Sequence, residues 1–368
     1  MISVFGSDMT AREITASSKV LSSQWIGFGA KVNEFEVELA RVRGLPNMTM
    51  VDSGSNALFM AVKLLDLPAG SEIILPSFTW VSCAQAVLLA GCLPIFCDVD
   101  YDSMNIRARD IEPLITSKTG AIMVVHYAGL PVEMNTILAF GIPVIEDAAH
   151  AIASDIDGKA CGTLGDIGIY SFDSVKNLAV GEGGGLVAQK DDIVERARRL
   201  RYCGIGKSGF EAAASNSSGR WWEYDISEPF IKMLPTNIAA AIGLVQLERL
   251  ETLQLRRKEI WNYYNSSFGD NEVIITPLEA PPGSSHSYFT YCIRVPRRDE
   301  LAKYLLANGV YSTLRYHPLH LNPIYRQSQR TLENSQKLNE TALSIPLHPR
   351  MTYVEMETVS ELILDYYR

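Results

Sequence analysis

The sequence predicts an α/β fold in which a large domain with a mainly parallel sheet precedes a small α+β domain. From about residue 50 to 190, short apolar runs rich in β-branched residues alternate with helix-like segments. With 368 residues, 47% of them hydrophobic, the chain is longer than a single hydrophobic core usually allows. A long amphipathic segment after residue 235 then leads into a region of different pattern.

The alternation places strands and helices in the large domain. Because parallel strands joined by helices bring their carboxyl ends to one edge of the sheet, catalytic groups are expected in the loops there. The predicted strands are Glu72–Leu75, Leu93–Cys97, Ala121–His126, Pro143–Ile145 and Ile167–Phe172, and the predicted helices are Asn56–Leu65 and Thr79–Ala90.

The small domain begins where the amphipathic segment, Thr236 to about Tyr264, leaves the large one. We place the boundary at residue 250, with a large domain over residues 1–250 and a small one over 251–368. Gly204–Arg220 and Ala280–Ser285 have the composition of loops. Beyond residue 270 the predicted strands are Tyr288–Val295 and Val310–Leu314, and the predicted helices are Leu301–Asn308 and Tyr353–Tyr367.

Composition excludes several classes of function. The formal net charge is −9, which argues against binding to nucleic acid or to an anionic membrane surface. The six cysteines form no CxxC pair and have no ligand-like spacing with histidine, so we expect reduced thiols and no metal site. No basic leader and no run of about 18 apolar residues occurs, and a cytoplasmic protein is therefore expected.

The segment from Gly168 to Gly185 combines the end of a strand, a polar loop with one lysine, Lys176, and a run of glycines. A lysine held beside an apolar strand end can have a lowered pKa and act as an imine-forming nucleophile. The glycines would allow a flat ligand to approach the backbone closely. Alternatively, Lys176 is a surface lysine beside a turn.

Two acids, Glu146 and Asp147, end the β-branched strand before His150. A carboxylate buried at a strand end can pair with a protonated pyridine nitrogen, and Asp147 suits that role. The alternative is that both acids cap a following helix.

A small polar loop, Asp52–Ala57, directly precedes an apolar helical pattern. Its backbone N–H groups, hydroxyls and helix amino terminus could hold a phosphate, although serine and asparagine are also ordinary helix caps. Trp80, just after the strand that ends near Pro76, could stack on a planar cofactor or be a core tryptophan.

Together these segments resemble the DegT/DnrJ/EryC1/StrS family of sugar aminotransferases, within the fold-type I, aspartate-aminotransferase-like pyridoxal-phosphate enzymes. The resemblance covers nearly the whole chain. Its segments are Gln24–Gly27, Phe35–Glu36, Ser53–Ser55, Pro76–Trp80, Asp98, Val125–His126, Glu146–His150, Tyr170–Phe172 with Lys176, Gly181–Gly184, Ala240–Leu244 with Gln246–Leu247, Pro318–His320 and Leu343–Pro346.

The resemblance implies that the large domain binds pyridoxal 5′-phosphate and that Lys176 holds it as a Schiff base and then moves the proton. Asp147 would pair with the pyridine nitrogen, and Trp80 would stack on the ring. His150 would lie near the ring hydroxyl, and three residues would hold the phosphate: Gly54, Ser55 and Ser171.

The same resemblance implies a homodimer with shared active sites and a two-stage reaction. Glutamate would leave its nitrogen on the cofactor, which would pass it to a nucleotide-linked keto-sugar in amino-sugar and polysaccharide biosynthesis. A sugar dehydratase of this family would carry histidine in place of Lys176. A cofactor-binding regulator would usually add a DNA-binding domain, for which the chain has no basic region.

The chain departs from the family pattern at two places. Leu234 occupies a position where relatives carry an asparagine that reaches the partner subunit's cofactor phosphate, and Arg315 replaces a histidine. The motif-matched segments give no clear arginine for the carboxylate of a keto-acid, which favours a sugar substrate. Lys232, Arg220 or Arg315 could neutralise a sugar diphosphate; the expected substrate contacts are Lys232, Arg315 and His320.

Overall fold

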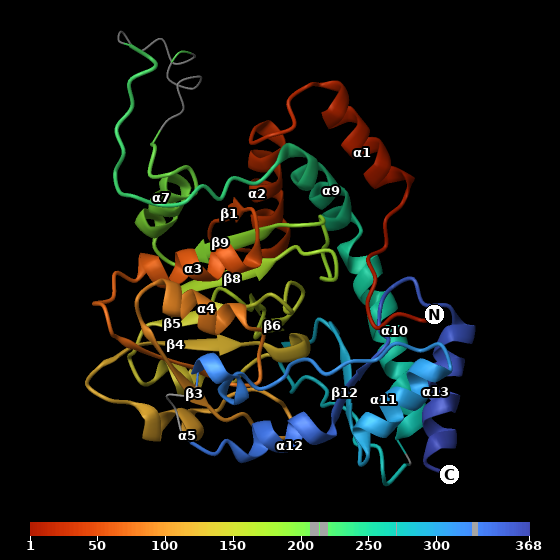
Figure 1. Cartoon of the computed structure of the whole chain (residues 1–368). Coiled ribbons are helices and arrows are strands. Elements are labelled where there is room, and N and C mark those ends of the chain that lie inside the picture. The colour runs from red at the N-terminus through yellow and green to blue at the C-terminus, as the bar shows by residue number, and fades with distance from the viewer. Residues whose placement is uncertain (207–212, 214–219, 270, 326–329) are drawn as a thin grey trace.

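The structure is a computed structural model, and it describes residues 1–206, 213, 220–269, 271–325 and 330–368. Figure 1 shows a central sheet with helices on both faces and a smaller unit at the carboxy-terminal end of the chain. This confirms the predicted α/β class.

The central sheet has seven strands in the order β1-β9-β8-β5-β4-β2-β3. Only β9 runs antiparallel to its neighbours, β1 and β8. Every strand predicted for the large domain is present, with ends that differ by one or two residues. The bounds are β1 Thr49–Val51, β2 Glu72–Pro76, β3 Leu93–Cys97, β4 Thr119–Val125, β5 Val144–Asp147, β8 Ile167–Ser171 and β9 Gly184–Ala188.

Alternate residues of the inner strands enter different cores, because successive side chains of a strand point to opposite faces. On β4, Met123 joins the core under α3, α4 and α7, whereas Ile122 and Val124 join the core on the other face. This two-sided burial explains why the inner strands are continuous apolar runs. The helices of the large unit are α1 Ala11–Ser22, α2 Ala30–Arg43, α3 Gly54–Leu64, α4 Ser82–Leu89, α5 Ala108–Ile111, α6 Met134–Leu138, α7 Asp191–Leu200 and α9 Asn237–Glu248.

The long amphipathic segment expected from Thr236 to about Tyr264 forms two helices, α9 and α10 (Leu250–Phe268), and α10 ends later than that segment. Arg249 lies between them with ψ near −2°, and its guanidinium pairs with the carboxylates of Asp8 and Glu13. The apolar pattern of the sequence continues through residue 249. The helix is nevertheless interrupted there, where Arg249 makes these ion pairs with the amino-terminal segment.

The carboxy-terminal unit has its own core around Trp261 and a two-stranded antiparallel sheet. The strand expected at Val310–Leu314 is wrong: this segment makes only isolated bridges, Val310 to Ile2 and Thr313 to Ser344. Three short elements, β6 (Asp155–Ile156), β7 (Lys159–Ala160) and β10 (Ser284–Ser285), form a separate small sheet. The elements of the unit's core are β11 Tyr291–Arg294, β12 Ala342–Ile345, α11 Arg298–Ala307, α12 Glu333–Thr341 and α13 Tyr353–Tyr366.

The amino terminus lies against the carboxy-terminal unit (Figure 1). The amide of Ile2 donates to the carbonyl of Gly309 at 2.8 Å, and the amide of Tyr311 donates to the carbonyl of Ile2 at 2.9 Å. The division at residue 250 stays a prediction, and these contacts place the first residues beside the second unit.

Most of the loop expected at Gly204–Arg220 lies outside the described residues. All six cysteines are free, and only Cys203 is not fully buried. In the described part of the chain, no helix is both long and apolar enough to cross a membrane.

Candidate active site

Lys176 lies in the loop that joins β8 to β9, at the carboxyl edge of the sheet where the predicted site residues gather. Its amine nitrogen is 4.7 Å from the ring centroid of Phe289. Burial, and next the charge of Arg315, lower the pKa of Lys176 from 10.5 to about 8, against the opposing effect of Asp147 and Asp173. No described carboxylate is within ion-pair distance of this amine, so it is a partly neutral nucleophile near neutral pH.

Asp147, the last residue of β5, is buried and faces this site. One carboxylate oxygen accepts the Ala149 amide at 3.0 Å, and the other accepts the thiol of Cys83 at 3.2 Å. Within the described residues it has no cationic partner. A buried carboxylate without a counter-charge is costly, and a cationic ligand group would offset that cost.

Glu146 points to the opposite face of the strand. Its carboxylate accepts hydrogen bonds from the His126 ring at 2.9 Å and from the amides of Gly162, Leu164 and Gly165. The alternative interpretation, that both acids cap a helix, is wrong, because a turn and not a helix follows β5. Asp147 is thereby the acid that faces Lys176.

The predicted phosphate-binding residues lie together at the amino terminus of α3. Gly54 is its first residue and packs so closely on Ser171 that an added Cβ would lie 2.7 Å from the Ser171 Cβ. The hydroxyl of Ser55 is 2.6 Å from that of Ser82, the first residue of α4. Ser82 was missed in the sequence because it lies inside a segment predicted as continuous helix from Thr79.

The glycine run after Lys176 has a different use from the one expected. A Cβ on Gly184 would lie 2.3 Å from the Ser53 carbonyl oxygen, so the close approach is between two backbone segments. Gly181, with φ near +97°, turns the loop back toward β9. These glycines shape the protein around the site, and nothing in their geometry requires a flat ligand against them.

His150 is buried and stacked on Phe289, with ring centroids 4.0 Å apart and ring planes 14° apart. Its Nε2 lies 3.1 Å from the Tyr316 hydroxyl, whereas its buried Nδ1 has no partner among the described residues. Burial, with smaller effects from Lys176 and Arg315, lowers the pKa of His150 well below its usual range. A neutral ring with one unused nitrogen can serve a ligand as a hydrogen-bonding partner.

Trp80 is 53% exposed, and its ring centroid lies 5.4 Å from that of Tyr316. It is therefore not a core tryptophan. Tyr316 and Phe289 were not singled out in the sequence. Tyr316 lies beside the family segment Pro318–His320 without being one of its matched residues, and Phe289 falls inside the predicted strand Tyr288–Val295.

The three predicted substrate residues are not brought together. Arg315 is buried beside Phe289, whereas Lys232 is exposed next to Tyr202. His320 is buried, and its Nδ1 lies 2.6 Å from the hydroxyl of Ser77, so it supports the loop that leads to Trp80.

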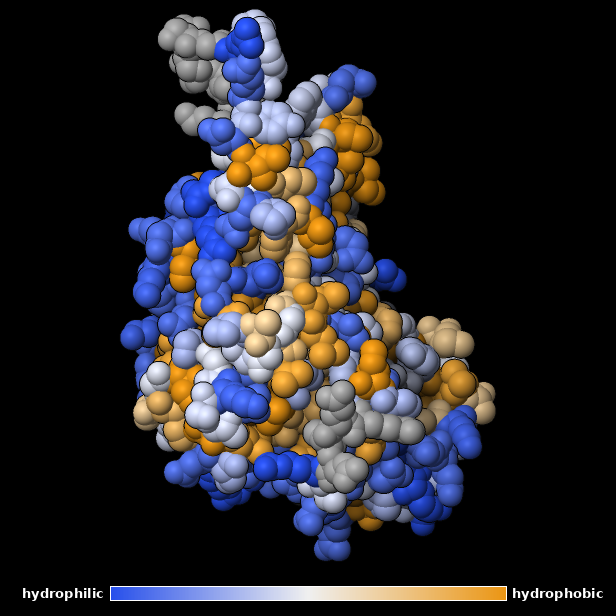
Figure 2. All heavy atoms as spheres, turned by 60° about the vertical axis from the view of Figure 1, so that its left-hand side comes forward, coloured by the Kyte–Doolittle hydropathy of each residue, from blue (hydrophilic) through white to orange (hydrophobic). Residues whose placement is uncertain are grey.

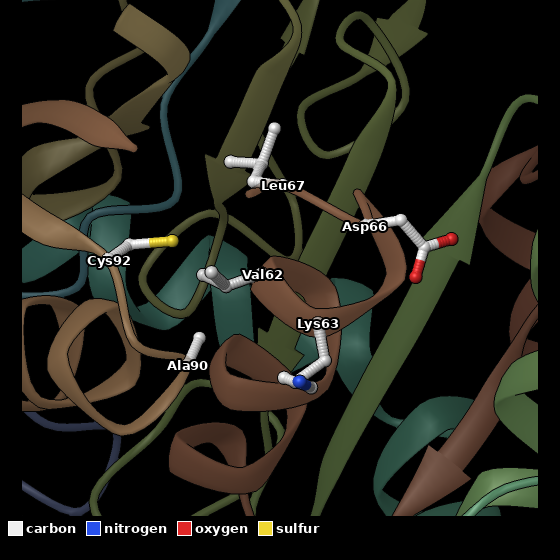
Figure 3. A pocket seen from close by; sticks show the side chains of 6 residues that line it. All are labelled: Val62, Lys63, Asp66, Leu67, Ala90 and Cys92. Carbon is white, nitrogen blue, oxygen red and sulfur yellow. The ribbon is translucent and has the colours of Figure 1, made fainter. Parts of the chain in front are cut away.

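A small pocket of about 150 Å³ lies at the opposite end of α3 from the predicted phosphate site (Figure 3). α3 has 11 residues, and at about 1.5 Å per residue its length separates the two places. The pocket contains none of the predicted site residues, and we assign it no part in the site. Its lining is Val62, Lys63, Asp66, Leu67, Ala90 and Cys92.

Comparisons with known proteins agree over nearly the full chain. Residues 7–364 match the model of the DegT/DnrJ/EryC1/StrS aminotransferase family. The chain is 36% identical to a dTDP-4-dehydro-2,3,6-trideoxy-D-glucose 4-aminotransferase of Saccharopolyspora spinosa, over 98% of this chain and 95% of the relative. It is 32% identical to the spore coat polysaccharide biosynthesis protein SpsC of Bacillus subtilis (strain 168), over 96% and 94%.

Solved structures give the same result. The aminotransferase TlmJ from Streptoalloteichus hindustanus superposes with a TM-score of 0.92 and 34% identity, covering 99% of this chain and 98% of TlmJ. A putative sugar aminotransferase, Spr1654 from Streptococcus pneumoniae in its PMP form, gives a TM-score of 0.91 and 27% identity, covering 98% and 97%.

Proposed function

Since the chain belongs to the DegT/DnrJ/EryC1/StrS aminotransferase family, we propose that it moves an amino group from an amino acid, glutamate by our expectation, to a nucleotide-linked keto-sugar. The observation that carries this proposal is the juxtaposition of Lys176, with its lowered pKa, and the unpaired carboxylate of Asp147. The family makes the protein an aminotransferase. The sugar substrate rests on relatives whose names state such a substrate or pathway.

The residues present fit pyridoxal 5′-phosphate, which the family implies as cofactor. The amino terminus of α3 offers free N–H groups and hydroxyls to a phosphate. Asp147 provides a buried negative charge for a protonated ring nitrogen, and the unused Nδ1 of His150 provides a hydrogen-bonding group. The buried charge of Asp147 and the buried Nδ1 of His150 are costly in an empty site, and the polar groups of this cofactor would satisfy both.

The proposed roles follow from these positions. Lys176 forms the covalent link and then carries the proton to and from the substrate carbon, because its amine loses a proton at a lower pH than an ordinary lysine. Asp147 holds positive charge on the ring nitrogen, and Trp80 packs against the ring. Gly54, Ser55 and Ser171, with Ser82, hold the phosphate. When bound, the cofactor supplies an electron sink for the substrate carbanion.

A homodimer is part of the proposal. Figure 1 shows the described residues 220–235, which precede α9, projecting from the body of the protein. This segment exposes five large hydrophobic side chains, and Figure 2 shows hydrophobic atoms on the upper part of the molecule beside it. Such a patch is typical of an interface. The exposed residues are Trp221, Trp222, Tyr224, Ile226 and Ile231.

The direct test incubates the purified protein and pyridoxal phosphate with glutamate and a panel of nucleotide-linked keto-sugars, with product masses read by mass spectrometry. An aminated nucleotide sugar is expected with at least one acceptor and none with Lys176→Ala. Amination of pyruvate and oxaloacetate, with no keto-sugar accepted, would overturn the sugar assignment.

A further inference from the structure

Arg315 is a buried cation without a counter-charge in the described part of the chain. It is 6% exposed, and neither a described carboxylate nor a described carbonyl accepts a hydrogen bond from its guanidinium. The four other buried arginines in the described part of the chain all have partners. Arg201, Arg294 and Arg298 pair with carboxylates, and Arg257 donates to three backbone carbonyls. The Tyr316 hydroxyl is a hydrogen-bonding partner of the Arg315 side chain, but it is neutral. Since a buried charge is rarely left without a counter-charge, the missing counter-charge of Arg315 is expected to be an anionic ligand.

The position of this cation limits which anion it can meet. The guanidinium carbon lies 4.9 Å from the ring centroid of Phe289, the same ring that Lys176 approaches to 4.7 Å. A second ring, that of Phe5, lies 4.7 Å from the guanidinium carbon and holds it from another direction. Arg315 is therefore fixed by aromatic contacts next to the reactive amine.

The two substrates differ in how far their negative charge lies from the reacting atom. In an amino acid donor, the α-carboxylate is bonded directly to the carbon that bears the reacting nitrogen. In a nucleotide sugar, several ring atoms and an oxygen separate the keto carbon from the first phosphate. A cation next to Lys176 thus matches the carboxylate of the donor better than the diphosphate of the acceptor.

We propose that Arg315 binds the α-carboxylate of the amino donor and so determines that an α-amino acid feeds the first half-reaction. The inference rests on the proposed function and revises the sequence-based expectation that Arg315 could neutralise the sugar diphosphate. The planar guanidinium can pair with a carboxylate through two parallel hydrogen bonds, which a lysine cannot reproduce.

The test measures the two half-reactions separately by rapid-mixing absorbance. With Arg315→Gln, transfer from glutamate to the enzyme is expected to slow about 100-fold or more, since a buried charged pair is lost. At a pH above the Lys176 inflection of both proteins, the rate at which the amine form reacts with an accepted keto-sugar is expected to stay within about 3-fold of wild type, a change too small for a lost charged pair. Arg315→Lys keeps the charge and much of the packing, so its rate with glutamate should fall between those of wild type and Arg315→Gln. Arg350→Gln, at an exposed position, should match wild type in both half-reactions.

Two further readouts separate recognition from a loss of fold. Wild type should prefer glutamate strongly over isoglutamine, its α-amide, and Arg315→Gln should lose that preference. The affinity for 2-oxoglutarate of the form with the cofactor linked to Lys176 can be measured by calorimetry. This affinity should also fall in Arg315→Gln. Loss confined to the sugar half-reaction, equal loss in both, or an unchanged glutamate preference would each overturn the proposal. A wild type without transfer from any amino acid would instead refute the proposed function itself.

Discussion

Glu146 and Asp147 show how one residue of register decides the role of a side chain. Both end β5, but Asp147 faces Lys176 and Glu146 closes the loop over 162–165 on the other face. The pairing of β5 with β8 places Asp147 opposite Ile169 and so sets which acid faces the site. A shift of one residue would exchange the two carboxylates.

Asp147→Asn is expected to lower turnover about 100-fold or more while cofactor binding largely persists, because a neutral amide cannot hold the ring nitrogen protonated. Steady-state kinetics and cofactor absorbance together measure this. Glu146→Gln is the matched control: it should lower the melting temperature through lost hydrogen bonds and leave more activity than Asp147→Asn. Lower activity in Glu146→Gln than in Asp147→Asn would show that Asp147 does not have the proposed role in the site.

The lowered pKa of Lys176 predicts how the rate of cofactor attachment depends on pH. A depressed pKa means that the amine releases its proton at a lower pH, so the reactive neutral form becomes available as pH rises through about 8. The rate at which cofactor-free protein combines with pyridoxal phosphate should therefore level off above about pH 8. In Arg315→Gln this inflection should move to higher pH, since a neighbouring charge is removed. An inflection near the ordinary 10.5 in wild type would contradict the assignment.

At the scale of elements, the predicted phosphate site depends on how tightly the start of α3 packs against the end of β8. A Cβ on Gly54 would meet the Ser171 Cβ at 2.7 Å. Alanine normally favours a helix over glycine, yet Gly54→Ala is expected to lose about 1–3 kcal/mol of stability because the added methyl has no space.

Thermal unfolding of the cofactor-free protein, and the affinity for pyridoxal phosphate, measure the effect of Gly54→Ala. Gly27→Ala serves as control, because nothing lies within 4 Å of a Cβ there. The control should unfold within a few degrees of wild type, whereas Gly54→Ala should melt lower and bind the cofactor more weakly. Equal behaviour of the two variants would show that the loop can relax.

The inner strands were predictable because burial on both faces produces continuous apolar runs. β1 and β9 were not predicted, since one is very short and the other lies in a glycine-rich segment. Lys176 and Asp147 could be found because Asp147 ends one such strand and Lys176 lies in the loop after another. Cys83, Phe289 and Tyr316 could not, because their place in the site depends on side-chain direction and on the packing of a distant unit.

At the scale of the whole molecule, the two units meet at the site. Phe289 and Arg315 come from beyond residue 250, whereas Lys176 and Asp147 come from the central sheet. A change in how the units pack would therefore alter the surroundings of Lys176 directly. This arrangement explains why neither unit alone contains the complete candidate site.

The projecting segment predicts assembly in solution. Sedimentation at assay concentration should show a homodimer, and Trp221→Lys with Trp222→Lys should shift it toward monomer and reduce turnover, because two apolar contacts become charged. Leu255→Lys, at an exposed position on α10, is the matched control and should remain dimeric. A fully active wild-type monomer would contradict the shared-site proposal.

The most direct test of the central claim is the identity of the lysine that carries the cofactor. Protein loaded with pyridoxal phosphate is reduced with borohydride and digested, and the modified peptide is sequenced by mass spectrometry. We expect the label on Lys176 alone, because its amine is buried at the carboxyl edge of the sheet with a pKa near 8. Label on Lys190 or another exposed lysine, with Lys176 unmodified, would contradict the account.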